Sequence, residues 1–293
     1  MDWRRDSAGW PHAQRSTFER VRPHLWHVQQ MGHGPDLVLL HGAGGATHSW
    51  RGLMPCLAEQ FRVTAMDLPG HGFTRRGAMQ RSSLPLMAED TWRLLDHLDC
   101  TPTALIGHSA GGALALQMSI TRSTPVFGIN TALEDFSGVA GWLFPMMARF
   151  LAINPLTSSA ISRMLRTSDV NGLLKGTGST LDAEGVALYA RCLSNADHIE
   201  GTLAMMSQWS LRGLRGRLDK ITAPVHLLAG SADRTVAPAT SERMAARMAH
   251  GTHETLTGLG HLAHEEAPEE VAARITAFVQ HLPEASAPAQ LRP

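Results

Sequence analysis

The sequence has few cysteines and no net charge. Three cysteines occur among 293 residues, at Cys56, Cys100 and Cys192, and none of them forms a C-x-x-C pair. Their wide spacing and odd number argue against a disulfide framework or a zinc knuckle and favour reduced thiols in a cytoplasmic protein. Lysine plus arginine and aspartate plus glutamate both number 26, so the chain lacks the basic surplus that binding to nucleic acid requires.

Long apolar runs and metal-binding motifs are also missing. Nowhere do about 18 apolar residues follow one another, so the sequence predicts no transmembrane segment. No apolar run follows Arg4 and Arg5, so we expect no secretory signal. The 16 histidines form no H-E-x-x-H or comparable cluster. We therefore expect neither a metal site nor an organic cofactor.

What the sequence does contain is an alternation of short strands and helices. Apolar runs predict strands at 25–30, 37–40, 62–68, 103–107, 126–130, 225–230 and 253–257. Helical spacing predicts helices at 110–121, near 241–249 and near 268–282. This alternation is typical of an α/β fold with a mostly parallel sheet and helices on both faces. Residues 1–16 are polar, and we interpret them as an extended arm.

Residues 132–216 interrupt the alternation, because they show helical patterns and no convincing strand. We predict a helical cap inserted into a core formed by 1–131 and 217–282, followed by a disordered tail at 283–293. Methionines and aromatic residues are frequent in the cap, where they can pack onto the core or line a wide apolar pocket. The candidates for the pocket are Trp142, Met146, Met147, Met205, Met206 and Trp209.

The strongest chemical signal is a G-x-S-x-G motif centred on Ser109. An apolar strand precedes it and a helix of small residues follows it, which is the context that a nucleophilic serine requires. The turn is sharp, so the residues two positions away must be small, and Gly107 and Gly111 satisfy this. We predict that Ser109 is a nucleophile; the alternative is an ordinary serine that caps the helix.

A serine hydroxyl needs a base to become a nucleophile at neutral pH. His261 follows the last predicted strand after two glycines that let the loop fold back, and we predict that it is the base. His264 competes for this role but falls where the next helix should begin. Asp233 follows the preceding strand and fits the chain order Ser…Asp…His, so we predict that it orients the imidazole. Asp135 is the alternative acid.

The reaction also needs backbone donors for a developing oxyanion. One is the N–H of Ala110, directly after the nucleophile. The other should come from the glycine-rich run His41–Gly45, with Ala43 as our choice and Gly44 as the alternate. This run lacks the G-x-G-x-x-G pattern with a following ribose-binding acid, and no G-K-[ST] occurs, so it does not predict nucleotide binding.

A second glycine-containing turn at 67–72 resembles a catalytic motif at first sight. It reads Asp-Leu-Pro-Gly-His-Gly and follows a predicted strand. We interpret it as a tight structural turn beside the site, with Asp67 and His71 in hydrogen-bonded scaffold roles.

These motifs together resemble the α/β-hydrolase superfamily. A more specific resemblance, to the BchO proteins of photosynthetic bacteria, covers most of the chain. The residues that carry this resemblance lie near the N-terminus and in the predicted cap. They are Met1-Asp2-Trp3, Trp10-Pro11-His12, Trp26-His27-Val28-Gln29, the run 176–189 (GTGSTLDAEGVALY) and the run 204–209 (AMMSQW). BchO proteins are described as magnesium-chelatase accessory proteins of bacteriochlorophyll biosynthesis. Ser109, Asp233 and His261 match the triad positions expected in that family.

The resemblance implies a tetrapyrrole context that the composition does not show. Our leading hypothesis is ester hydrolysis through an acyl-enzyme on Ser109. The substrate would be bulky and apolar, such as a porphyrin-type ester, and the partners would be magnesium-chelatase subunits. A second hypothesis is a non-catalytic module that binds a porphyrin for the chelatase. A third is C–C bond hydrolysis or perhydrolysis on the same three residues.

Overall fold

The computed structural model describes residues 1–77, 80–134 and 167–283. Within these ranges, eight strands form one sheet in the order β1-β2-β4-β3-β5-β6-β7-β8. The pairs β1·β2 and β2·β4 are antiparallel and the others are parallel, which confirms the predicted mostly parallel sheet. The strands are β1 (Ser16–Val21), β2 (His24–Met31), β3 (Asp36–Leu40), β4 (Arg62–Met66), β5 (Pro102–His108), β6 (Val126–Ile129), β7 (Val225–Gly230) and β8 (Gly251–Leu256).

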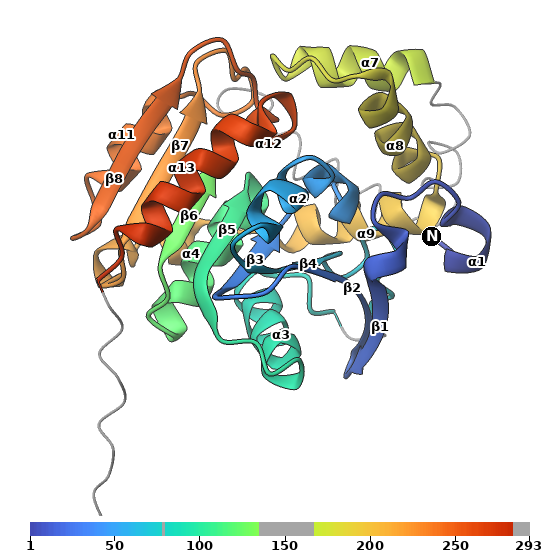
Figure 1. The fold of residues 1–293 in the computed structure, drawn as a ribbon, viewed down its shortest axis with the longest axis horizontal. Coiled ribbons are helices and arrows are strands. Elements are labelled where there is room, and N and C mark those ends of the chain that lie inside the picture. Colours follow the sequence, from blue (N-terminus) through green and yellow to red (C-terminus); the bar gives the residue numbers. More distant parts are fainter. Residues whose placement is uncertain (78–79, 135–166, 284–293) are drawn as a thin grey trace, which may run out of the picture.

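Helices cover both faces of this sheet (Figure 1). The helices near it are α2 (Leu53–Ala58), α3 (Leu84–His97), α4 (Ala110–Thr121), α11 (Ala239–Ala245), α12 (Ala263–Glu266) and α13 (Pro268–Gln280). Helices α2 and α13 contact each other on one face, and α3 and α4 contact each other on the other. Because both faces are covered, the central strands are continuous apolar runs rather than alternating ones.

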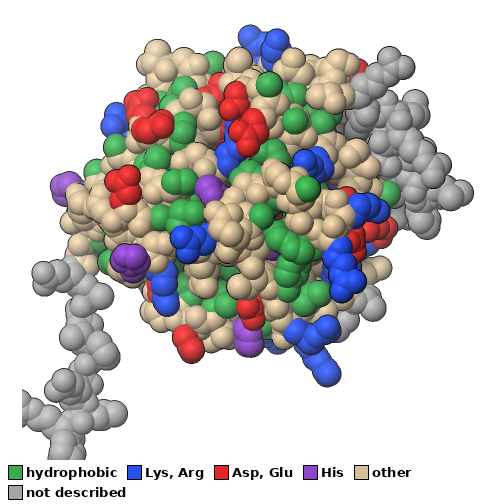
Figure 2. Space-filling view, turned by 45° about the vertical axis from the view of Figure 1, so that its right-hand side comes forward, with side chains coloured by type: hydrophobic (Ala, Val, Ile, Leu, Met, Phe, Trp, Pro, Cys, Tyr) green, Lys and Arg blue, Asp and Glu red, His purple; other side chains and the backbone are tan. Residues whose placement is uncertain are grey.

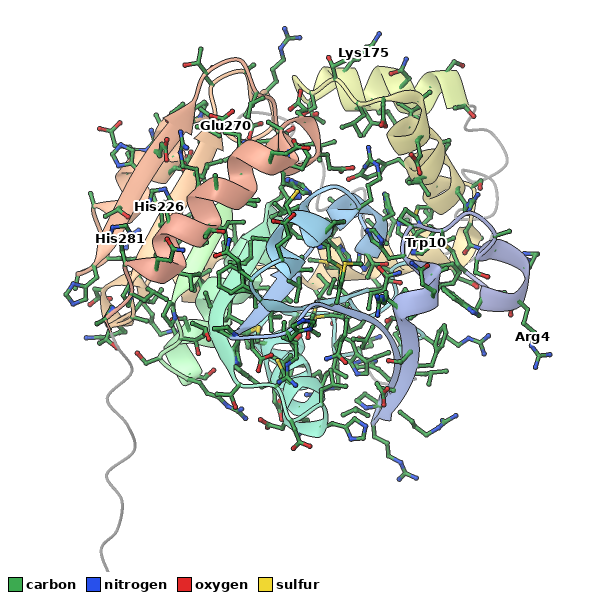
Figure 3. The ribbon with its side chains drawn as sticks, in the orientation of Figure 1. Arg4, Trp10, Lys175, His226, Glu270 and His281 are labelled. Carbon is green, nitrogen blue, oxygen red and sulfur yellow. The ribbon has the colours of Figure 1, made fainter. Side chains whose placement is uncertain are left out.

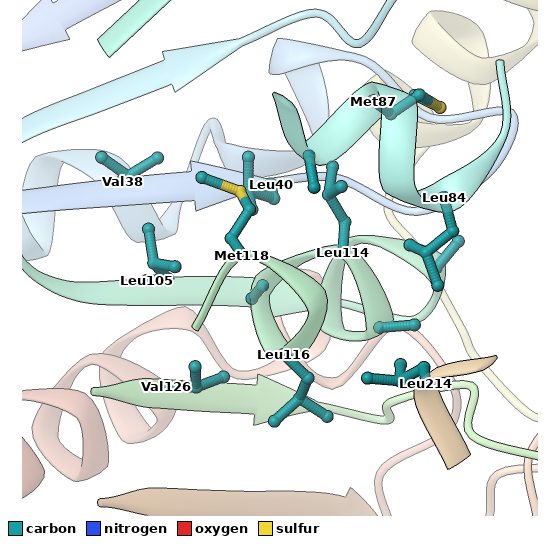
Figure 4. Packing of buried hydrophobic residues seen from close by; sticks show 14 of the residues in the cluster. Val38, Leu40, Leu84, Met87, Leu105, Leu114, Leu116, Met118, Val126 and Leu214 are labelled. Carbon is teal, nitrogen blue, oxygen red and sulfur yellow. The ribbon is translucent and has the colours of Figure 1, made fainter. Parts of the chain in front are cut away.

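Strand β3 shows how the two faces divide the core. Val38 and Leu40 point into the cluster formed with α3 and α4, where Leu114 and Met118 meet them (Figure 4). Leu37 and Leu39 point to the opposite face and join the cluster formed with α2 and α13. Successive side chains of a strand point to opposite faces, so one short apolar run contributes to both cores. Burial on both sides fixes the register that brings the carboxyl ends of the strands together.

The interpretation of residues 1–16 as an extended arm is wrong. This segment folds back as α1 (Trp3–Asp6) and a 3₁₀ turn (Ala13–Arg15), and β1 begins directly after it. Trp10, labelled in Figure 3, is 3% exposed. Its indole Nε1–H donates to the hydroxyl of Thr47 at 3.1 Å. The ring also makes an edge contact with Phe73, so burial of an aromatic side chain ties the segment to the core.

Between β6 and β7, the described residues of the predicted cap contain helices and no strand. These helices are α7 (Thr167–Gly176), α8 (Ala183–Leu193), α9 (Ala196–Gln208) and α10 (Arg212–Arg215). Asp135, Trp142, Met146 and Met147 lie outside the described residues, as does the tail from 284 onward.

Charged side chains of both signs lie on the surface, and the helices are short. On the face in Figure 2, acidic and basic side chains lie interspersed among apolar ones. Throughout the described ranges, each helix is too short or too polar to cross a lipid bilayer.

Candidate active site

Ser109 stands on a strained turn between β5 and α4. Its φ of 52° and ψ of −115° are unusual for a residue with a side chain. A Cβ added at Gly107 would lie 2.4 Å from the carbonyl oxygen of Gly111, and one added at Gly111 would lie 2.0 Å from that of Leu40. The two glycines of the motif are therefore required by close backbone approach. The turn presents the Ser109 hydroxyl at the carboxyl edge of the sheet.

The structure brings the three predicted side chains together. The Ser109 hydroxyl lies 3.0 Å from Nε2 of His261, and Nδ1 of His261 lies 2.8 Å from Oδ2 of Asp233. His261 and Asp233 are 6% and 8% exposed, so their contact is largely shielded from water. With Asp233 ionised, Nδ1 carries the ring proton and donates a hydrogen bond to the carboxylate. The lone pair of Nε2 then accepts from the serine hydroxyl.

Asn130 is a member of this network that the sequence did not predict. It follows β6 with a φ of 48°, a left-handed conformation that asparagine tolerates. Its Nδ2 donates to Oδ2 of Asp233 at 2.7 Å, and the backbone N–H groups of Thr235 and Val236 donate to Oδ1. Burial raises the pKa of Asp233, but the hydrogen bond and charge of His261 and these donors outweigh it and hold the pKa below its usual value.

The two alternatives for the triad lie elsewhere or outside the described residues. His264 is fully buried against Trp50 and His108, and neither of its ring nitrogens has a hydrogen-bond partner among the described residues. Burial keeps the pKa of His264 well below its usual value. Glu134, the neighbour of Asp135, turns away and accepts hydrogen bonds from Thr240 and Arg243. The contact with Ser109 is made by His261.

The predicted oxyanion loop lies beside the nucleophile. A Cβ added at Gly42 would lie 3.1 Å from Cβ of Ser109. The carbonyl of Gly42 accepts hydrogen bonds from Nδ1 of His41 at 2.7 Å and from the N–H of Gly45 at 3.1 Å. The peptide unit is planar and trans, so these bonds also fix the direction of the Ala43 N–H. The second predicted donor, Ala110, begins helix α4, where backbone N–H groups have no partner within the helix.

Residues of the 67–72 turn occupy a scaffold position. Asp67 is fully buried and accepts hydrogen bonds from Nδ1 of His27 and from the N–H groups of Thr47 and Phe73, at 2.7, 2.7 and 2.8 Å. His71 is also fully buried, with Nδ1 3.4 Å from the carbonyl oxygen of Pro69. Among the residues that the structure describes, no group of three or more His, Cys, Asp or Glu side chains is placed to hold a metal ion.

Comparison with known proteins identifies the family of this chain. Residues 37–274 match the family model described as "Alpha/beta hydrolase family". The chain is 43% identical to the magnesium-chelatase 30 kDa subunit of Rhodobacter capsulatus over 284 residues, which cover 96% of this chain and 100% of that protein. The chain belongs to the BchO family of α/β-hydrolases.

Two further proteins that are similar to this BchO-family chain are named as hydrolases. It is 27% identical to the pimeloyl-[acyl-carrier protein] methyl ester esterase of Nitrosospira multiformis over 272 residues, covering 87% of this chain and 98% of that protein. The solved structure of the epoxide hydrolase CorEH superposes with a TM-score of 0.74 at 25% identity, covering 90% of this chain and 98% of that one.

One cap segment that carries the BchO resemblance contacts two loops of the site. The carbonyl of Thr177 accepts from the N–H of Arg234, next to Asp233, at 3.0 Å. The hydroxyl of Ser179 accepts from the N–H of Leu262, next to His261, at 2.8 Å. Sequence reasoning noted this segment but assigned it no role in the site, because its partners lie far along the chain.

Three of the predicted pocket residues are described; one is buried in the core and two are partly exposed. Met205 is 1% exposed and belongs to the core cluster that contains Met66 and Leu68. Trp209 is partly buried and packs against that same cluster. Met206, on α9, is partly exposed. Packing of α9 against the core cluster therefore occupies Met205, while Met206 and Trp209 retain exposed surface.

Proposed function

We propose that this BchO-family protein is a serine hydrolase that cleaves a carboxylic ester through Ser109, His261 and Asp233. The observation that carries the proposal is the line of two contacts, 3.0 Å from the serine hydroxyl to Nε2 and 2.8 Å from Nδ1 to the carboxylate. The same arrangement of nucleophile, base and orienting acid is the general signature of an activated serine. The proposed oxyanion donors are the N–H groups of Ala43 and Ala110.

The proposed reaction has two halves. The Ser109 oxygen attacks the ester carbonyl as its proton moves to Nε2 of His261, and the negative charge that develops on the carbonyl oxygen faces the backbone donors. His261 then gives that proton to the leaving alcohol, which leaves an acyl group on Ser109. Water attacks the acyl carbonyl with His261 again as base, and the carboxylic acid departs as Ser109 recovers its proton. No metal or cofactor takes part in these steps.

We further propose a bulky, apolar substrate, such as a tetrapyrrole ester, and magnesium-chelatase subunits as partners in the cytoplasm. The support is the name of the Rhodobacter capsulatus relative, which is a magnesium-chelatase subunit. The exposed parts of Met206 and Trp209 at the cap support the apolar character, because methionine and tryptophan adapt to large flat ligands. The esterase among the relatives supports the choice of ester over C–C bond or perhydrolase chemistry.

One observation favours a second candidate function. The name of that relative is the name of a subunit and states no reaction of its own. A module that binds a porphyrin and presents it to the chelatase, with Ser109 unused, would fit that name equally well.

Labelling with a fluorophosphonate probe separates the two functions. We expect the parent protein to gain one phosphonyl group, detected by mass spectrometry, and Ser109→Ala to gain none, because only an activated serine attacks the probe. Ser119→Ala is the matched control, since the Ser119 hydroxyl donates to the carbonyl of Thr124 and lies away from the site. Absence of labelling in the parent, together with a change in porphyrin absorbance on mixing, would favour the binding module.

A further inference from the structure

His198, on cap helix α9, lies against the loop that carries the proposed oxyanion donor. Nε2 of His198 lies 3.1 Å from the carbonyl oxygen of Gly44, the residue after Ala43. Nδ1 of His198 lies 2.9 Å from the backbone nitrogen of Gly72 in the structural turn. The side chain is fully buried. One imidazole from the cap therefore joins two loops of the core.

The hydrogen-bond pattern fixes which ring nitrogen of His198 carries the proton. The N–H of Gly72 can only donate, so Nδ1 must be the unprotonated acceptor. Nε2 then carries the hydrogen and donates it to the Gly44 carbonyl. Burial lowers the pKa of His198 to about 4, so the ring is neutral in this role at neutral pH. A neutral imidazole with one donor and one acceptor satisfies both loops at once.

The backbone of helix α9 around His198 packs closely on the core and is capped at its start. One turn along the helix, Gly201 packs directly on Gly70, and a Cβ added at Gly201 would lie 2.0 Å from the carbonyl oxygen of Gly70. At the start of the helix, the Asn195 side chain accepts from the N–H groups of Asp197 and His198 at 3.1 and 3.2 Å. The imidazole therefore projects from a seated backbone and not from a loose loop.

We propose that His198 is a positioning residue that holds the oxyanion loop in its catalytic shape. His41, inside the core, holds the carbonyl of Gly42, the residue before Ala43. His198, on α9, holds the carbonyl of Gly44, the residue after Ala43. The Ala43 N–H is then held from both sides, and Gly44, with its φ of +76°, is kept in a left-handed conformation. Docking of α9 onto the core therefore also places the Ala43 N–H for the oxyanion. This inference rests on the proposed ester hydrolysis.

Two substitutions separate the two hydrogen bonds of the ring. His198→Asn places an amide oxygen near the position of Nδ1, which preserves the acceptor for Gly72 and removes the donor to Gly44. His198→Gln places an amide nitrogen near the position of Nε2, which restores the donor to Gly44. Glu200→Gln is the control, because it removes a partly exposed charge on the same helix, which pairs with Arg76, and leaves the imidazole in place.

The first readout is hydrolysis of a short p-nitrophenyl ester. Losing one oxyanion donor outright costs on the order of 10²–10³ in kcat, so a donor that is only displaced should cost about tenfold. We expect His198→Asn to lower kcat about tenfold with KM nearly unchanged, and His198→Gln and Glu200→Gln to keep most of the kcat. An unchanged kcat in His198→Asn, or equal losses in the Asn and Gln variants, would overturn the proposal.

The second readout does not depend on catalysis. Amide hydrogen exchange in the peptide covering residues 41–45 should be faster in His198→Asn than in the parent and in His198→Gln, because the loop has lost its anchor. Equal exchange in all three proteins would refute the positioning role even if the parent cleaves no ester. A parent that is inactive but shows the faster exchange in His198→Asn would refute the proposed hydrolysis and leave the anchor established.

Discussion

At the scale of single residues, Asp233 is held by more donors than its partner in catalysis alone would require. His261, Asn130 and two backbone N–H groups all donate to its carboxylate. Hydrogen bonds to the charged form favour ionisation, which explains a lowered pKa in a buried carboxyl. An ionised Asp233 selects the tautomer of His261 that carries its proton on Nδ1, so the lone pair of Nε2 faces Ser109.

Asp233→Asn tests this selection. The amide NH₂ group can donate to Nδ1, which would move the ring proton to Nε2 and block acceptance of the serine proton. We expect kcat for a p-nitrophenyl ester to fall by roughly 10⁴-fold while the fold is kept. The control is Glu134→Gln, which alters a carboxylate bonded to Thr240 and Arg243 instead of His261. Loss of less than tenfold in Asp233→Asn would show that the acid does not set the tautomer.

At the scale of elements, the sequence predicts best where an element is buried along its whole length. Helix α4 and strand β7 occur at the predicted residues, because their apolar runs are continuous and have glycines at or beside their ends. Strand β1 was not predicted. It lies at the edge of the sheet with no fully buried residue, so its alternation of apolar and polar side chains is weak.

In the site too, residues that follow a local sequence motif could be predicted, and residues whose partners lie far along the chain could not. Ser109, Asp233 and His261 could be predicted because each follows a strand with its own turn residues, and chain order did the rest. His198 and Ser179 could not be predicted, since their partners lie 154 and 83 residues away and a lone buried histidine or serine has no local pattern. Asn130 left only a faint signal, an asparagine at the end of a strand where a left-handed residue fits.

At the scale of the whole molecule, one buried carboxylate joins three parts of the chain. Asp67 receives hydrogen bonds from β2, from the turn before α2 and from its own loop. Burial alone would raise the pKa of Asp67, but the charge and hydrogen bond of His27 and the backbone donors hold it far below its usual range. A carboxyl with a depressed pKa in the folded state stabilises the fold above its unfolded pKa, and this contribution falls as the pH drops below that value.

Asp67→Asn should therefore destabilise the protein in a pH-dependent way. At pH 7 we expect the free energy of unfolding in urea to fall by about 3 kcal/mol, the upper end for losing a hydrogen bond to a charged group. The difference from the parent should shrink as the pH falls below about 4, the usual pKa of an aspartate in an unfolded chain. Asp219→Asn, at an exposed position, serves as the control. A difference that stays constant down to pH 3 would contradict this account of Asp67.

The central claim is that the imidazole of His261 removes the proton of the Ser109 hydroxyl. The most direct test is kcat/KM for a short p-nitrophenyl ester in the parent and in His261→Ala. Because Nε2 of His261 lies 3.0 Å from the Ser109 hydroxyl, we predict that loss of the imidazole lowers kcat/KM by at least about 10²-fold. A kcat/KM that is unchanged in His261→Ala would contradict the role of His261 as the base.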